Sequence, residues 1–65
     1  MKITYDVESD ILRILFRHVP IKESDEERPG IVFDFDKKGN VVGLEVLNAS
    51  KRVENPKSLE YAIDE

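Results

Sequence analysis

The sequence contains no cysteine and no tryptophan, and it has only three glycines and three prolines among its 65 residues. The absence of cysteine excludes disulfide bonds, thiolate metal sites and a thiol nucleophile, so none of these can reinforce a small core. A chain of this length is expected to form a single domain, residues 1–65, that buries a modest fraction of its surface. We therefore expect that a partner chain stabilises the fold.

Long apolar runs and a basic surface are also missing. Charged residues make up 37% of the chain and the formal net charge is −4, which disfavours direct binding to nucleic acid. Without a membrane span or a signal-peptide core, we expect a cytoplasmic protein that does not contact a membrane. Because no glycine-rich phosphate loop is present, we also expect no cofactor. Plentiful lysine and glutamate, with no glutamine, indicate a thermophilic source.

Most of the chain alternates apolar and polar residues. This period of two predicts strands over 2–6, 11–17, 31–36 and 41–47. In each strand the more uniformly apolar row is assigned to the core: Ile3, Tyr5, Leu12, Ile14, Phe16, Ile31, Phe33, Phe35, Val42, Leu44 and Val46. The acidic run 23–27 suits either an edge strand that must not aggregate or a loop, and the sequence leaves that choice open.

The end of the chain changes period. Asn55-Pro56 is a typical helix start, and Leu59, Ala62 and Ile63 then recur at three-to-four spacing. The predicted fold class is α+β: a small antiparallel β-meander of four to five strands within residues 1–48, with one short C-terminal helix over 55–64. That helix is expected to pack on the core face, because it is too short to persist alone.

The stretch 34–45, DFDKKGNVVGLE, matches most positions of a calcium-binding EF-hand loop. Lys38, however, stands where that loop needs an oxygen ligand, and the flanking residues predict strands instead of helices. A hairpin with a loop of residues 37–40 explains more, and Gly39 and Asn40 are expected to supply its positive-φ positions. In that hairpin each core residue meets a core residue: Ile31 with Val46, Phe33 with Leu44 and Phe35 with Val42.

The face opposite the predicted core is not uniformly polar. If its aliphatic residues cluster, they form a patch that needs a partner, and the charges between them would fix the register. The candidate interface consists of Ile11, Arg13, Leu15, Arg17, Val32, Asp34, Glu45 and Leu47. We expect a homodimer in which Arg13 or Arg17 of one chain meets Asp34 or Glu45 of the other.

Two further functions are weighed against self-association. An acidic contact strip could bind a small basic protein, and it consists of Glu23, Asp25, Glu26 and Glu27. Alternatively, Asp34, Asp36 and Glu45 could form a small hydrolytic or metal-dependent enzyme, although so short a chain leaves little room for a pocket. His18 is the only histidine and has no orienting partner in the sequence, so a catalytic role is not expected. We therefore predict a protein-interaction module with no catalytic residues, no cofactor site and no metal site.

Several short motifs occur in a fixed order along the first fifty residues. They are Tyr5-Asp6, Asp10 with Leu12, Gly30 with Asp34-Phe35-Asp36, Gly43 with Glu45, and Ala49-Ser50. Together they resemble the short prokaryotic proteins of domain-of-unknown-function family 2283. Val7 and Asn48 depart from the family pattern, which usually has proline and often has aspartate there. The resemblance implies a β-meander with a C-terminal helix and no known catalytic residues. It also implies an antitoxin-like binding role, because some members are encoded beside small toxin-like proteins.

Overall fold

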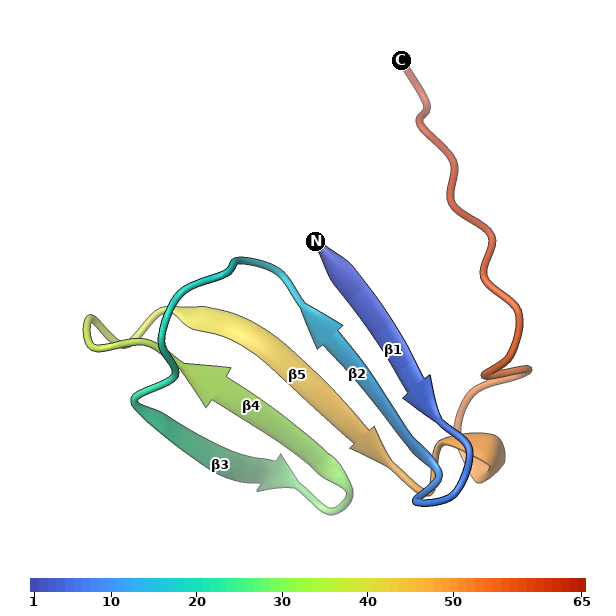
Figure 1. Ribbon diagram of the computed structural model, residues 1–65, viewed down its shortest axis with the longest axis horizontal. Helices are drawn as coiled ribbons and strands as arrows, with labels where there is room; N and C mark the ends of the chain where they lie inside the picture. The colour runs from blue at the N-terminus through green and yellow to red at the C-terminus, as the bar shows by residue number, and fades with distance from the viewer.

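The computed structural model describes all 65 residues and contains one antiparallel sheet of five strands (Figure 1). The elements are β1 (Lys2–Asp6), β2 (Ile11–Leu15), β3 (Glu23–Arg28), β4 (Ile31–Phe35), β5 (Val41–Leu47) and the 3₁₀ turn η1 (Ala49–Lys51). The spatial order is β1-β2-β5-β4-β3. A β1–β2 hairpin and a β3–β4–β5 meander therefore meet where β2 pairs with β5, an order that the sequence does not predict.

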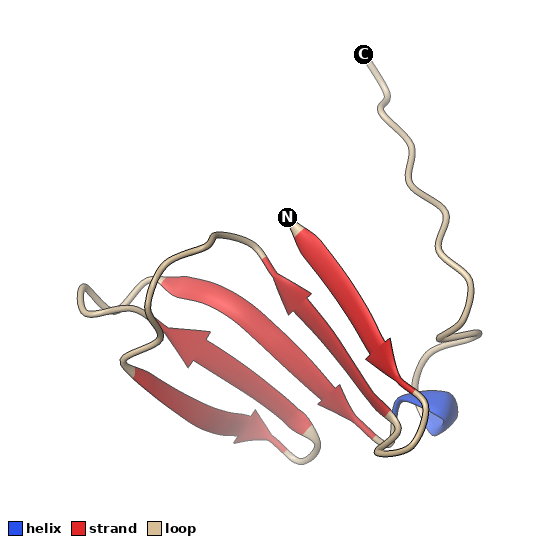
Figure 2. Cartoon of the chain, viewed as in Figure 1, coloured by secondary structure: helices blue, strands red, loops and turns tan.

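The predicted α+β fold class is wrong, because the protein is essentially all-β. Figure 2 shows strands and loops with one short helical turn, and no α-helix packs on either face of the sheet. The C-terminal residues run away from the sheet as an extended tail (Figure 1). No helical segment is long and apolar enough to cross a membrane.

The predicted helix begins but does not propagate. Asn55 accepts a hydrogen bond from the Lys57 amide through its side chain at 3.1 Å, and one from the Ser58 amide through its carbonyl at 3.1 Å. A single turn closes in this way, but continuing it would fix many dihedral angles in a segment with little docking surface. Acidic residues at 64–65 would also oppose the helix dipole at its C-terminal end. The segment stays extended as a result.

The β4–β5 register is confirmed at two of the three predicted pairs, Ile31 with Val46 and Phe33 with Leu44. The third predicted pair is wrong, because a bulge shifts the register and sets Phe35 opposite Val41. Val42 is the extra residue at this bulge and is fully buried. Its carbonyl accepts a hydrogen bond from the Phe16 amide at 2.8 Å, which joins the bulge to the end of β2.

The hairpin loop turns on one glycine. Gly39 has a φ of 82°, as predicted, but Asn40 is not among the positive-φ residues. Asn40 instead anchors the loop, because its carbonyl accepts a hydrogen bond from the Asp36 amide at 3.0 Å. The stretch that matches an EF-hand in spacing is therefore a β-hairpin.

Two other predictions about the strands are settled by the topology. Phe16 was assigned to the core, but β2 ends at Leu15 and Phe16 is 40% exposed. The chain must leave β2 at this point to reach β3 at the far edge of the sheet (Figure 1). The acidic run is a strand and not a loop, since residues 23–27 lie within β3.

Candidate functional site

One face of the sheet is formed by apolar side chains from four adjacent strands. Residues paired directly across antiparallel strands share a face, so the register defines two rows. The rows are Ile3–Ile14–Leu44–Phe33 and Tyr5–Leu12–Val46–Ile31, and we call these residues the apolar face. Of them, only Val46 is buried, and the rest are half-buried. A sheet normally hides such a face beneath a second layer, and here no second layer of strands or helices is present.

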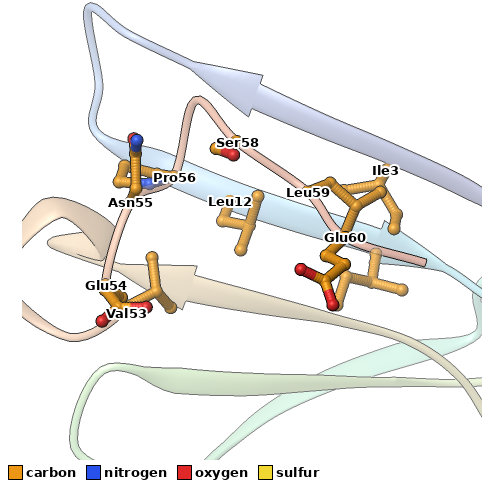
Figure 3. Close-up of a pocket in the computed structure, with 10 residues that line it drawn as sticks. Ile3, Leu12, Val53, Glu54, Asn55, Pro56, Ser58, Leu59 and Glu60 are labelled. Carbon is orange, nitrogen blue, oxygen red and sulfur yellow. The ribbon is translucent and has the colours of Figure 1, made fainter. Parts of the chain in front are cut away.

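The C-terminal tail covers the β1 side of the apolar face incompletely. A cavity of about 370 Å³ separates the tail from the sheet (Figure 3). Its apolar lining consists of Ile3, Leu12 and Ile14 from the sheet and Val53 and Leu59 from the chain beyond it. This pocket is open to solvent, so the tail does not complete a closed core with the sheet.

The opposite side of the sheet, which we call the mixed face, carries most of the predicted interface. Ile11, Leu15, Val32 and Leu47 are half-buried there. They do not form one continuous patch, because Arg13 and Glu45 lie in the row between Leu15 on one side and Ile11 and Leu47 on the other. Arg13 lies directly opposite Glu45 of the same chain, whereas the sequence predicted charge pairing between chains. Arg17 lies beyond the end of β2.

Asp34 is the least expected residue of the mixed face, because it is only 1% exposed. Its Oδ1 accepts a hydrogen bond from the Ser24 hydroxyl at 2.6 Å, and its Oδ2 is buried without a partner. Across the ladder lies Gly43, and a Cβ added there would stand 3.3 Å from Oδ2 and 2.9 Å from the Ile14 carbonyl oxygen. The missing side chain of Gly43 therefore makes room for the Asp34 carboxylate.

Asp36 is committed to its own loop. Its Oδ1 accepts hydrogen bonds from the Asn40 and Lys38 amides, both at 2.9 Å, and its Oδ2 accepts one from Asn40 Nδ2 at 3.3 Å. The Asn40 amide contributes most to lowering the pKa of Asp36 below its ordinary value. This carboxylate closes the hairpin, as Asp does in an Asx-turn.

The three carboxylates of the enzyme hypothesis do not share a site. Asp34 is buried against Ser24, Asp36 turns into the hairpin loop, and Glu45 lies opposite Arg13. No group of three His, Asp or Glu side chains is placed to hold a metal ion. Asp36 and Glu45 line different pockets, and Asp34 lines none.

The predicted acidic strip lies along the β3 edge of the sheet, and every residue of β3 is exposed. The register divides its side chains between the two faces. Asp25 is opposite Phe33 on the apolar face, whereas Glu26 is opposite Val32 on the mixed face. Glu26 also accepts a hydrogen bond from the Gly30 amide at 3.0 Å in the β3–β4 turn. The strip is thus a charged edge and not a single flat patch.

A hydrogen-bonded clasp joins the β1–β2 turn to η1. Asp10 Oδ1 accepts hydrogen bonds from the Tyr5 hydroxyl at 2.7 Å and the Ser50 amide at 2.9 Å, and Oδ2 accepts one from the Ser50 hydroxyl at 2.7 Å. The Asp10 carbonyl accepts another from the Ala49 amide at 2.9 Å. Asp10 has a φ of 58°, a strained value that surrounding contacts must maintain. Sequence reasoning gave this cluster no role.

One protein family matches most of the chain. The family described as protein of unknown function (DUF2283) matches residues 2–50. The chain belongs to this family. An uncharacterized protein from Methanocaldococcus jannaschii is 41% identical over 51 residues, which cover 78% of this chain and 43% of that relative. The chain thus aligns with less than half the length of the relative. No solved structure matches.

The DUF2283 match ends at Ser50, just after the clasp is complete, and leaves the C-terminal tail outside it. The residues that carried the resemblance have structural tasks in the fold. Tyr5, Asp10 and Ser50 form the clasp, while Asp34 and Gly43 occupy one cross-strand position. Periodicity could not reveal the clasp. The only signal for it was the motif order itself.

The clasp predicts a pH dependence of stability. Hydrogen bonds from the Ser50 hydroxyl, and then from Tyr5, lower the pKa of Asp10. The resulting stabilisation is fully present above the ordinary carboxyl pKa of about 4 and is lost as pH falls through the lower pKa of the folded state. We expect Asp10→Asn to lower the melting temperature at pH 7 and to flatten its fall between about pH 5 and pH 2. Thermal melts followed by circular dichroism across this range test the prediction.

The hydrogen bond from Tyr5 to Asp10 also makes stability fall at high pH. Donation to Asp10 raises the pKa of Tyr5, so this stabilisation is present below about pH 10 and is lost as pH rises through the higher folded-state pKa. Tyr5→Phe should therefore flatten the fall in melting temperature above about pH 10, while Asp10 keeps its hydrogen bonds to Ser50. Wild-type-like acid and alkaline limbs in both variants would contradict the assignment of the clasp.

Proposed function

We propose that the protein is a protein-interaction module whose working form is a homodimer, packed through the apolar faces of two copies. The observation that carries the proposal is the apolar face itself, two rows of side chains from four strands that only the C-terminal tail covers in part. Two sheets that stack face to face bury such rows in an interface about 10 Å thick. A two-fold axis would use the same face of each copy.

The exposed area supports this proposal. The accessible surface is 5324 Å², whereas a folded chain of 7.5 kDa is expected to expose about 4,200 Å². The excess of roughly 1,100 Å² exceeds the roughly 800 Å² that each partner buries in a standard stable interface. The open apolar face and the extended tail both contribute to it. A dimer can therefore remove the excess without any change in the sheet.

The proposal moves the interface away from the mixed face. The sequence suggested the mixed face because a helix was expected to cover the other side, and that helix is absent. Charged Arg13 and Glu45 also cross the mixed face, and interface centres are usually poor in charge. The apolar face has the composition of an interface core.

Antitoxin-like binding of a small basic protein stays a second candidate. The observation that favours it is the complete exposure of β3, whose acidic side chains can attract a basic surface. Protection of a sheet edge against aggregation explains the same charges, and their division between two faces weakens the case for one docking patch. Self-association therefore ranks first.

Light scattering coupled to size exclusion tests the proposed function. At tens of micromolar we expect a mass close to twice the 7.5 kDa of the chain. Dilution should shift the mass towards one chain, and the shift gives the dissociation constant. A mass of one chain over the whole concentration range would overturn the homodimer and leave the acidic strip as the remaining candidate.

A further inference from the structure

Residues 59–64 alternate large apolar residues with small or acidic ones, a pattern typical of a β-strand, but they pair with no strand of the sheet. Leu59, Tyr61 and Ile63 are 67%, 68% and 72% exposed, which is unusual for three large apolar residues so close together. The segment has no regular secondary structure of its own, and if it formed a strand its alternate side chains would point to opposite sides. One side would then be apolar, and the other would present Glu60, Ala62 and Asp64.

The sheet has one edge that suits such a strand. β1 pairs only with β2, so its outer backbone amides and carbonyls have no strand partner. Natural proteins protect an edge with charge, as β3 does with its acidic run, but β1 carries Ile3 and Tyr5 at the margin of the apolar face. A strand added to β1 could extend both rows of that face.

We propose that residues 59–63 of one copy pair as a strand with the β1 edge of a second copy. This inference rests on the proposed homodimer and names the segment that completes it. Leu59, Tyr61 and Ile63 then continue the apolar face beside Ile3 and Tyr5. The added segment is as long as β1, which has five residues. Exchange of an identical segment between copies is a low-cost route to a closed dimer.

The course of the tail favours a second copy over its own sheet. In its own chain the tail shares with β1 and β2 the lining of a pocket of about 370 Å³ (Figure 3) and then runs along the outer side of β1 and away from the sheet (Figure 1). The tail forms no strand beside β1 in its own chain, and its apolar side chains stay exposed.

Paramagnetic broadening in mixed dimers tests the exchange directly. Because the chain has no cysteine, Ala62→Cys supplies a single attachment point for a spin label, on the polar side of the tail. The labelled chain, without isotopes, is mixed with an unlabelled, ¹⁵N-enriched wild-type chain. We expect selective broadening of the amides of residues 2–6 in the enriched chain. A label at Lys38→Cys, in the distant hairpin loop, is the matched control and should spare β1.

The outcomes separate this inference from the proposed function. A mass of one chain overturns both. A stable dimer with no broadening of β1, or with broadening of β3 instead, overturns the exchange and leaves the homodimer intact. As a second measurement, Tyr61→Glu should weaken the dimer about tenfold or more, because the charge would enter the extended apolar face. Ala62→Glu, on the polar side, should leave the dissociation constant unchanged, and equal weakening by both variants would contradict the strand.

Discussion

Replacing Gly43 with alanine is expected to destabilise the protein by about 1–3 kcal/mol, the usual range for overpacking. A glycine in a strand is ordinarily a weak point, and alanine there usually gains about 0.5–1 kcal/mol. At position 43 the effect on stability is reversed, and alanine is expected to destabilise the protein. The new Cβ would stand 2.9 Å from the backbone oxygen of Ile14, which cannot turn away as a flexible side chain can. A domain of this size has a total stability of only about 3–10 kcal/mol, so a sizeable fraction of it is lost.

Gly39→Ala is the matched control for this prediction. Nothing lies within 4 Å of a Cβ at Gly39, so the only penalty there is the positive φ of 82°. That backbone strain costs about 1–2 kcal/mol. Gly43→Ala carries a different penalty, because its Cβ must displace the β2–β5 backbone pairing and crowd Asp34. Urea unfolding of both variants at one protein concentration should place the midpoint of Gly43→Ala lower. The reverse order would show that the close approach across Gly43 relaxes at little cost.

The β4–β5 hairpin shows how far alternation predicts this fold. Burial requires every second residue to share a face, and that requirement together with a loop over residues 37–40 predicted the pairs Ile31–Val46 and Phe33–Leu44. It could not set Phe35, because a bulge adds one residue without disturbing the apolar pattern of either strand. The strand order was also out of reach, since either strand of the β1–β2 hairpin could have paired with β5.

The C-terminal segment shows why the helix prediction failed. The residues 59–63 satisfy two periods at once, because Leu59 and Ile63 lie one helical turn apart and also alternate with Tyr61 as strand residues do. Propensity cannot decide between the two in so short a segment. Helical or extended structure depends on what the segment packs against, and in the single chain it packs against little.

The surroundings of Asp34 and Asp10 were harder to predict than the strands, because they depend on contacts with residues distant in the sequence. Asp34 was assigned to a candidate interface on the sheet surface, and it is buried beside Ser24 and Gly43. Asp10 was noted only as part of a motif, and it is hydrogen-bonded to Ser50, 40 positions further along the chain. The apolar face was predicted residue by residue. That this face lies largely uncovered was not predicted, because the sequence indicated a C-terminal helix that would cover it.

The pair Ile14 and Leu15 tests which face of the sheet associates. They are adjacent in β2, half-buried alike and directed to opposite faces, so each is a control for the other. Ile14→Glu should weaken the dimer about a hundredfold or more, equivalent to about 2.7 kcal/mol, because its carboxylate would be buried without a partner between two apolar faces. Leu15→Glu should leave the dissociation constant close to that of the wild type, because the mixed face stays in solvent.

Sedimentation equilibrium of the two variants, with circular dichroism to verify that each keeps its strand content, decides between the faces. Loss of the dimer in Leu15→Glu alone would place the interface on the mixed face, where the sequence first located it. Loss in both would mean that the sheet itself is too weak to fold without its partner. Loss in Ile14→Glu alone, with the strands retained, is the expected result, since it is the one that follows when an open apolar face is covered by a second copy of itself.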